Sequence, residues 1–255
     1  MIFCVMVVGG VWSEVHAGGG GSLGDESFLM GDDDFAEHQI DVLSEANKLL
    51  FVDDNLRGIT EPLTLIYDFS HRSAYDKAYG GRVLVKVNRV RENGRKDLVF
   101  RYLRGKHRIR FHPRPNMKTN PLFMLFLESD AREMQRITGG SSLFFRSRLR
   151  QSLAAAGTEA ITFDYEGKQV DGYRIVIRPY DEMMRDPQDK KSKKLIERFE
   201  KFRYKTYEFI LSSHVLGGIY RLRSFVPDES GEAVQIDDLL LYRGFERHRV
   251  EGAGL

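Results

Sequence analysis

Five Lys or Arg side chains and two His crowd into the twelve-residue segment from Arg104 to Pro115, RGKHRIRFHPRP. Guanidinium groups bind carboxylate, phosphate or sulfate through paired hydrogen bonds. Arginine also recurs at two-residue intervals, and on a strand residues i and i+2 project from the same face. We therefore expect a basic face that binds an anionic ligand, although a polar, solvated side of an antiparallel sheet would have the same pattern. The expected residues of this face are Lys106, Arg108, Arg110, Arg114, Arg221 and Arg223.

The amino-terminal segment indicates the compartment of the protein, and the compartment decides which anions the protein can bind. Residues 1–12 are almost wholly apolar, but a membrane-spanning helix needs ~20 such residues. They fit the apolar region of a secretory signal, and Val15-His16-Ala17 provides small side chains where a signal peptidase cleaves. We expect a periplasmic protein cleaved after Ala17, with a buried amino-terminal strand as the alternative. Nucleic acid is scarce there, so the expected partners are anionic lipid or polysaccharide, with peripheral membrane contact.

Charge is unevenly distributed along the chain. All 39 Lys and Arg residues follow Asn47, whereas nine of the 37 acidic residues precede it, so the remainder carries about +11. Blocks of like charge are usually solvated. We expect an acidic, glycine-led flexible arm at 18–46, a single β-rich domain at 47–245 and a tail at 246–255.

Strand patterns dominate that domain. Apolar and polar residues alternate in LTLIYDF (63–69) and RVLVKVNRV (82–90), and DLVFRYL (97–103) followed by HRIRFH (107–112) predicts a hairpin. Five further short patterns follow, and Gly217-Gly218 is typical of a hairpin turn. The sequence predicts an α+β fold: a strongly curved, half-barrel-like antiparallel sheet of seven to nine strands.

Two or three helices are expected on the open side of this sheet. The first begins at Asn120-Pro121 and ends at Gly139, a second follows Ser142, and a third covers 191–202. The first helix opens with six consecutive apolar residues, Leu122 to Leu127, where packing on a sheet needs only one apolar stripe. This segment is either ordinary core or the lid of an apolar cavity, and the residues expected there are Leu122, Phe123, Phe126 and Leu127.

Catalytic and metal-binding patterns are not readable in the sequence. The histidines lack partners at ligand spacing, and TGGSSLFF is not a nucleophile elbow. We expect no catalytic residues, no metal, no cofactor and no enzymatic activity. The alternatives are a hydrolase of an envelope polymer that uses acids such as Glu128 or Asp130, and a structural subunit of an envelope assembly.

In architecture, the chain resembles the periplasmic lipoprotein carriers of the lipoprotein-localisation pathway and their β-rich relatives. The likeness lies in the order of a signal-like segment, a curved antiparallel sheet and helices such as Asn120–Thr138 over its open side. The segment from Asn120 to Leu153 also resembles segments of exported bacterial proteins. The resemblance implies an apolar cavity that holds acyl chains, and it transfers no site residue. We thus expect an exported, non-enzymatic cell-envelope protein that binds or carries an anionic or lipidic ligand.

Overall fold

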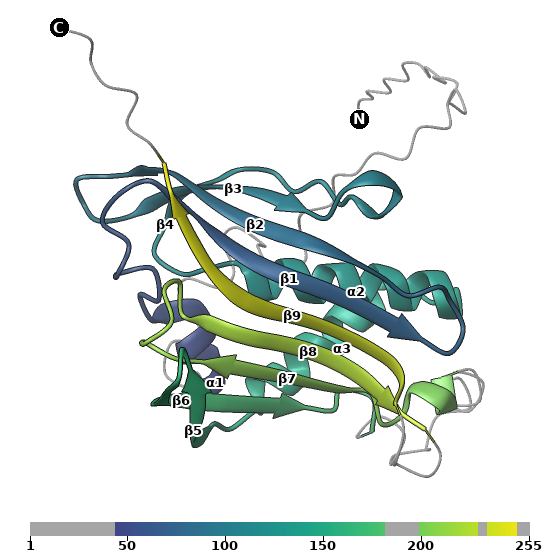
Figure 1. Ribbon diagram of the computed structural model, residues 1–255. Helices are drawn as coiled ribbons and strands as arrows, with labels where there is room; N and C mark the ends of the chain where they lie inside the picture. The colour runs from purple at the N-terminus through teal and green to yellow at the C-terminus, as the bar shows by residue number, and fades with distance from the viewer. Residues whose placement is uncertain (1–43, 182–198, 229–233, 249–255) are drawn as a thin grey trace, which may run out of the picture.

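The computed structural model describes residues 44–181, 199–228 and 234–248. In this part of the chain, nine strands form one antiparallel sheet in the order β4-β3-β2-β1-β9-β8-β7-β6-β5 (Figure 1). The strands are β1 Leu63–Ser73, β2 Tyr79–Val90, β3 Lys96–Tyr102, β4 Arg114–Met117, β5 Glu159–Tyr165, β6 Lys168–Ile177, β7 Thr206–Leu211, β8 Ile219–Pro227 and β9 Val234–Arg247. The predicted α+β class with a curved antiparallel sheet is confirmed.

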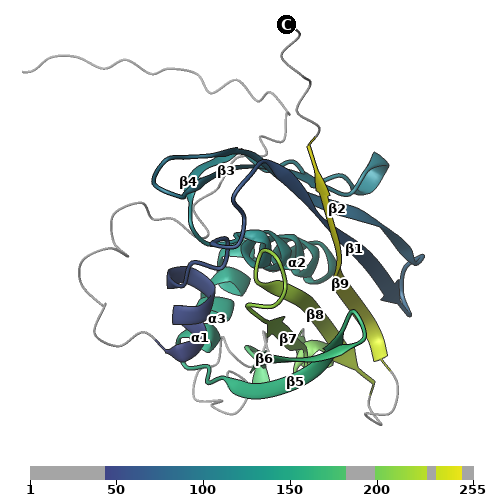
Figure 2. The same ribbon diagram turned by 60° about the vertical axis from the view of Figure 1, so that its left-hand side comes forward.

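The two helices α2 (Leu122–Thr138) and α3 (Ser142–Ala154) lie on the concave side of the sheet (Figure 2). Alternate residues of each strand point to this side because successive side chains project to opposite faces. In β1, for example, Leu65, Tyr67 and Phe69 are buried and alternate with half-buried residues. The core therefore lies between the inner face and the two helices.

Local signals account for both ends of α2. The Asn120 side chain accepts a hydrogen bond from the backbone N–H of Leu122, and it donates one to the Gly217 carbonyl at 2.9 Å. Gly139 ends the helix at φ 62°, the left-handed conformation that suits glycine. The predicted stop is thus confirmed, and the helix begins at Leu122, one residue after the predicted first residue Pro121. The Gly217-Gly218 turn has φ 85° and 77°, as a glycine turn requires.

The folded part begins earlier than the sequence predicted. A short helix α1 (Glu45–Asn47) continues into a π-helical segment, Lys48–Val52, and Ala46 is fully buried. The Ser44 hydroxyl donates to the Leu153 carbonyl at the end of α3. Residues 44–46, which charge alone assigned to the flexible arm, therefore belong to the packed body.

The predicted hairpin between 97–103 and 107–112 is wrong. A single turn of 3-10 helix, Gly105–His107, replaces the start of the second strand, and only a bridge between Tyr102 and Ile109 remains. The reason is local, because Leu103 and Gly105 have φ 60° and 61° and turn the chain out of the strand direction. β3 pairs instead with the later strand β4.

Strand β9 extends beyond the predicted end of the domain at residue 245. Residues 246 and 247, assigned to the tail, are the end of β9 and pair with β1. The signal segment, the arm up to residue 43 and most of the third helix lie outside the described residues, although Glu200–Phe202 form a 3-10 turn. No described helix has the length and apolar character to cross a membrane.

Candidate functional site

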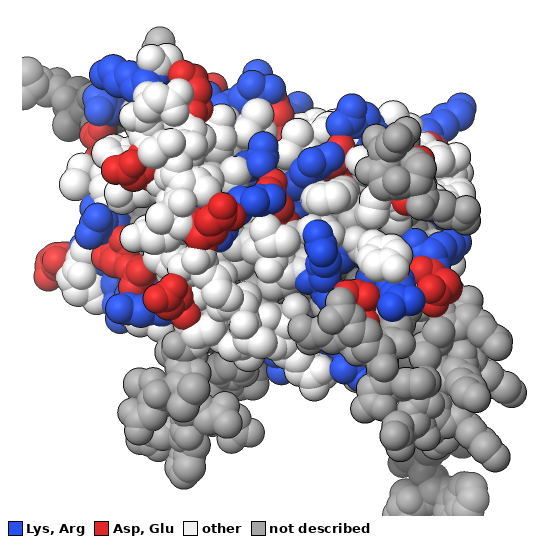
Figure 3. Space-filling model, turned by 90° about the horizontal axis from the view of Figure 1, so that it is seen from below, with Lys and Arg blue, Asp and Glu red and all other residues white. Residues whose placement is uncertain are grey.

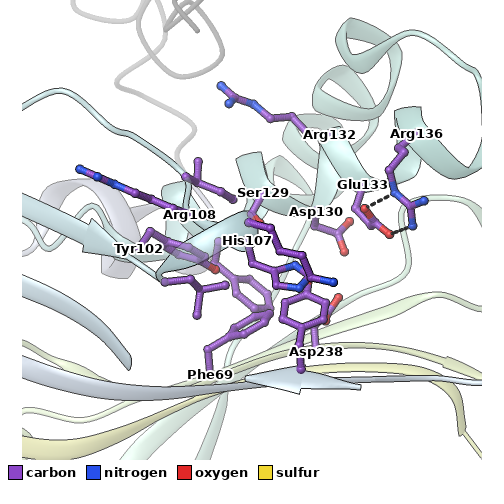
Figure 4. A pocket seen from close by; sticks show the side chains of 15 residues that line it. Phe69, Tyr102, His107, Arg108, Ser129, Asp130, Arg132, Glu133, Arg136 and Asp238 are labelled. Carbon is purple, nitrogen blue, oxygen red and sulfur yellow. Dashed lines mark hydrogen bonds and ion pairs between the residues drawn. The ribbon is translucent and has the colours of Figure 1, made fainter. Parts of the chain in front are cut away.

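A cavity of about 270 Å³ lies between α2, the inner face of the sheet and the loop 103–109 (Figure 4). Its apolar wall comes from four strand, loop and helix side chains: Phe69, Leu103, Ile109 and Phe126. Tyr79, Tyr102, Ser129, Asp130 and Asp238 add polar groups, and Lys106, Arg108, Arg132 and Arg136 add cations. The cavity therefore combines apolar walls, hydrogen-bonding groups and a cationic rim.

Asp238 on β9 forms part of the cavity wall, and its partner is His71 on β1. His71 Nδ1 lies 2.6 Å from Asp238 Oδ1, and the two side chains are only 3% and 11% exposed. Burial alone would lower the pKa of His71, but the hydrogen bond and the charge of Asp238 outweigh it and raise that pKa. Burial raises the pKa of Asp238, against the opposing effect of His71 and Lys205. The Asp238 carboxylate thus stabilises the protonated imidazole of His71 in this buried pair.

Asp130 connects α2 to β7, to Lys205 just before it and to β8 through both of its carboxylate oxygens. Oδ1 contacts Lys205 Nζ at 2.6 Å and accepts from the Ser224 hydroxyl, and Oδ2 accepts from the Tyr207 hydroxyl. Asp130 and Lys205 are 3% and 2% exposed. A buried charge needs such partners, because isolated ions are costly to remove from water. These contacts hold the middle of α2 in place over the sheet.

An aromatic stack positions the loop that covers the cavity. The His107 ring lies 3.7 Å from the Tyr79 ring at 8°, and the opposite side of the stack is the His71 ring, 4.6 Å from Tyr79. Burial and the neighbouring charges of Lys106 and His71 lower the pKa of His107. The stack therefore attaches the 3-10 turn to β1 and β2.

The rim of the cavity has two cations without carboxylate partners. Lys106 and Arg108 are exposed, and neither has an ion pair within the described ranges 44–181, 199–228 and 234–248. Arg132 is held by Glu128 at 2.6 Å, and Arg136 by Glu133, as Figure 4 shows for the latter. Lys106 and Arg108 are thus the rim cations that an anion can use without breaking an existing pair.

The six residues expected on one basic face lie in different parts of the molecule. Lys106 and Arg108 line the cavity, Arg110 is exposed on the same loop, and Arg114 lies in β4. Arg221 and Arg223 project from β8 on the convex side, because Leu222 and Ser224 point inward. The common face inferred from arginine spacing is therefore not formed by these six residues.

On the convex side, arginines alternate with acids across neighbouring strands. Arg174 and Arg221 share Glu208, and Arg72 and Arg223 share Asp237. These arginine pairs lower the pKa of both acids although burial opposes the shift. Figure 3 likewise shows Lys and Arg interspersed with Asp and Glu over the face seen from below. The solvated-sheet interpretation of the two-residue spacing holds for Arg221 and Arg223.

The apolar segment of α2 is part of the core. Leu122, Phe123, Phe126 and Leu127 are all at most 2% exposed. Phe126 also lines the cavity, and Phe123 packs edge-on against Phe51 at 5.0 Å. The helix is apolar all round here because the sheet lies on one side and the segment around Phe51 covers another.

A second, larger hollow of about 1020 Å³ lies at the other end of the sheet. Its walls are the 53–58 loop, the β5–β6 hairpin and the turn at Gly217-Gly218. Asp53, Asp54 and Asp171 contribute acids and Arg57 a cation. In this lining the acids outnumber the cations, whereas the lining of the first cavity has four Lys or Arg residues for three acids.

The acids named for a hydrolase are engaged in ion pairs. Glu128 accepts from both Arg132 and Arg146, and both oxygens of Asp130 have partners. Neither is free to act as a general acid or base in this arrangement. The described residues contain no group of three or more His, Cys, Asp or Glu placed to hold a metal ion.

Sequence reasoning missed Asp238, which lines the cavity, and its partner His71. His71 and Asp238 are 167 positions apart, so no spacing rule joins them. One signal was present, since Asp237-Asp238 interrupts an apolar strand in VQIDDLLLY, and an acid in such a strand needs a buried partner.

Comparisons with known proteins give a likeness in architecture. No family model and no curated protein matches the chain. Lipoprotein LppX of Mycobacterium tuberculosis is 8% identical with a TM-score of 0.32, and the match covers 77% of this chain and 91% of that one. A LolA superfamily protein of Nitrosomonas europaea is 9% identical with a TM-score of 0.22, over 80% and 94%.

The resemblance to lipoprotein-localisation carriers drawn from the sequence agrees with these matches at the level of architecture. The curved sheet with helices on its open side rests on the strand order and packing of this chain itself.

Proposed function

We propose that this chain is an exported, non-enzymatic cell-envelope protein that binds an anionic lipidic ligand at a membrane surface. The carrying observation is a group of four exposed cations on one loop: Arg104, Lys106, Arg108 and Arg110. None of them has a carboxylate partner in the described part of the chain. In contrast, many arginines of the sheet are paired with acids.

The electrostatics of this loop favour a membrane surface. Each basic residue near an anionic bilayer contributes ~1 kcal/mol before screening, so four together give a substantial attraction. The same loop covers the cavity beneath α2, so a lipid head group bound to the loop would lie next to a hollow with apolar walls. The electrostatic attraction to a membrane and the cavity are therefore both located at this loop.

Sedimentation with liposomes tests the proposal. We expect binding to anionic but not neutral vesicles, and a steep loss of binding as salt rises because exposed charges are screened. Arg108→Ser/Arg110→Ser should weaken binding strongly. The matched control is Lys168→Ser/Arg178→Ser, which removes two exposed charges from β6 and its carboxyl end, far from the loop in the sheet order. Equal binding to both vesicle types, or to neither, would contradict the proposal.

A further inference from the structure

The three acids that line the cavity beneath α2 all have cationic partners. The pairs are Asp130–Lys205, Asp238–His71 and Glu133–Arg136. A charged group placed among these pairs would compete with one of their members, and a charge removed from water without a partner of its own is costly. The remaining wall is apolar, with Phe69, Leu103, Ile109 and Phe126. The interior of the cavity therefore suits an uncharged, apolar group.

The mouth of the same cavity has an excess of positive charge. Lys106 and Arg108 line the rim, and Arg104 and Arg110 are exposed on the same loop. None of the four has an ion pair within the residues that the structure describes. In Figure 4, Arg108 extends away from the acids on the other side of the cavity. The site thus fits a ligand whose apolar part enters the cavity and whose anionic parts stay at its mouth.

The volume limits the size of the apolar part. About 270 Å³ lies just below the ~300 Å³ at which sites for drug-sized molecules begin. Such a space suits the side chains of a short apolar peptide segment. The ligand need not be a separate molecule if this chain itself contains such a segment with carboxylates beside it.

The acidic arm, residues 18–43, contains a segment of this kind. It lies outside the described residues, and it has no Lys or Arg. Phe28-Leu29-Met30 are three consecutive apolar residues, with Asp25 and Glu26 before them and three further acids, Asp32 to Asp34, after them. Carboxylates on both sides of an apolar centre complement a cationic rim around an apolar cavity.

The length of chain between this segment and the folded body is sufficient. The described chain begins at Ser44, whose hydroxyl donates to the Leu153 carbonyl at the end of α3. The 14 residues from Met30 to Ser44 reach at most ~46–50 Å when extended. Helix α2, with 17 residues, is only ~25 Å long. The arm can therefore reach either end of α2 from its attachment point.

We propose that the acidic arm docks on the cavity of its own chain. Phe28-Leu29-Met30 occupy the apolar interior, and the acids on both sides pair with the loop cations, Lys106 and Arg108 first. Because the arm is covalently attached, its effective concentration is high and weak contacts suffice to hold it. The docking needs no membrane, so it stands apart from the proposed function.

Disulfide trapping in the full chain tests the position of the arm. Ser27→Cys/Ser129→Cys, in a Cys4→Ser background, places one thiol beside the apolar trio and one on α2 at the cavity. The control pair Ser27→Cys/Ser213→Cys uses an exposed serine of the second hollow. We expect the first pair to close roughly tenfold faster under mild oxidation, because a disulfide forms only between Cα atoms within about 7 Å.

Three outcomes of the trapping experiment decide the proposal. A fast Ser27–Ser129 bond whose advantage falls as salt rises would support it, because exposed ion pairs are screened. Equal closure of the two pairs would overturn it. Disulfide-linked dimers in place of a bond within one chain would show that the arm docks on a second copy, which also overturns it.

A pair of charge variants tests the role of the acids. Asp25→Asn/Glu26→Gln removes two carboxylates beside the apolar trio, and Glu37→Gln/Asp41→Asn removes two from the rest of the arm. Both change the net charge equally. In the trapping background, the first should slow Ser27–Ser129 closure about fivefold, the equivalent of two exposed ion pairs, and the second should leave it nearly unchanged. Equal effects would show only general charge attraction and would overturn the docking.

Trypsin provides a measurement on the unaltered chain. The four loop cations are trypsin sites, whereas the arm has none and stays attached during digestion. We expect slow cleavage after Arg108 and Arg110 relative to cleavage after the exposed Lys168, and a faster relative rate for Asp25→Asn/Glu26→Gln. A relative rate that is the same in wild type, in this variant and in high salt would contradict docking on the loop.

Vesicle sedimentation separates this inference from the proposed function. The docked arm and an anionic membrane would use the same cations, so Asp25→Asn/Glu26→Gln should bind anionic vesicles more tightly than Glu37→Gln/Asp41→Asn. If trapping succeeds and no protein binds vesicles, the proposed function fails and the docking stands. If vesicles bind but the two cysteine pairs close equally, the docking fails and the proposed function stands.

Discussion

Asp130 joins α2 to β7 and β8, and Asp238 joins β9 to β1, through buried polar contacts on the concave side. Asp130 reaches Lys205, Tyr207 and Ser224, and Asp238 reaches His71. Desolvation makes such ion pairs poor sources of net stability, but removal of one partner leaves a buried charge and is strongly destabilising. At the scale of residues, these contacts define where α2 sits more than how tightly it packs.

The pH dependence of stability should reveal the His71–Asp238 pair. Because the folded state raises the pKa of His71, its contribution is complete below the ordinary value of 6.5 and is lost as the pH rises through the raised pKa. The acids that face His71 come from β9, α2 and the β1–β2 turn: Asp238, Glu133 and Asp76. We expect the free energy of unfolding to fall above pH 6.5 with a slope of at most about 1.4 kcal/mol per pH unit.

Urea unfolding of wild type and His71→Gln across this range measures that slope. The His71→Gln slope should be flatter, and Asp238→Asn should also flatten it because it removes the carboxylate that holds the proton. The lowered pKa of His107 acts in the opposite direction and below pH 6.5, so it does not mask the effect. Parallel profiles for wild type and His71→Gln would show that the pair does not titrate as described.

At the scale of elements, α2 is fixed at its amino end by Asn120. This side chain is fully buried, caps the helix at Leu122 and bonds the Gly217 carbonyl in the β7–β8 turn. It thereby links the start of the helix to the opposite end of the sheet from the cavity. The backbone N–H of Asn120 in turn bonds to the Asn55 side chain at 2.6 Å, which adds the 53–58 loop to the same junction.

Asn120→Ala should lower the free energy of unfolding by about 2–4 kcal/mol. A lost cap costs about 1 kcal/mol, and an unsatisfied buried carbonyl adds about 1–3 kcal/mol. Asn93→Ala is the control, because Asn93 caps only an exposed turn and its loss should change stability by less than about 0.5 kcal/mol. Similar midpoints of urea unfolding for the two variants would argue against a structural role for Asn120.

The chain as a whole has an acidic first part and a basic remainder, which carries about +11. Many arginines of the sheet form ion pairs on its convex side. The four exposed cations between Arg104 and Arg110 have no such partners in the described residues, and the proposed function depends on them. The compartment in which the protein resides determines which anions this loop meets. The proposed envelope ligand therefore requires that the protein is exported.

Export with cleavage after Ala17 remains a prediction. Amino-terminal sequencing of the protein from a cell-envelope fraction should give Gly18 as the first residue. Replacement of Ala17 by a bulky residue such as Phe should leave the precursor uncleaved, because a signal peptidase needs a small side chain at this position. Protein that keeps Met1 in the cytosol would refute both export and the envelope ligand.

The sequence by itself determined the elements, because alternation, caps and glycine turns are local. It predicted the β1, β2 and β3 patterns, the ends of α2 at Asn120 and Gly139, and the curved-sheet class. It did not predict the loop 103–109, where two positive φ angles at Leu103 and Gly105 override an alternating pattern. Side-chain alternation predicts a strand only when a partner strand is present to receive its hydrogen bonds.

Only the tertiary structure decided the site. It separated Arg108 from Arg221 and Arg223 by placing them on opposite sides of the sheet, and it brought His71 to Asp238 across 167 positions. These facts depend on strand order and on how α2 packs against the inner face, and both are set by long-range packing that no local pattern in the chain encodes.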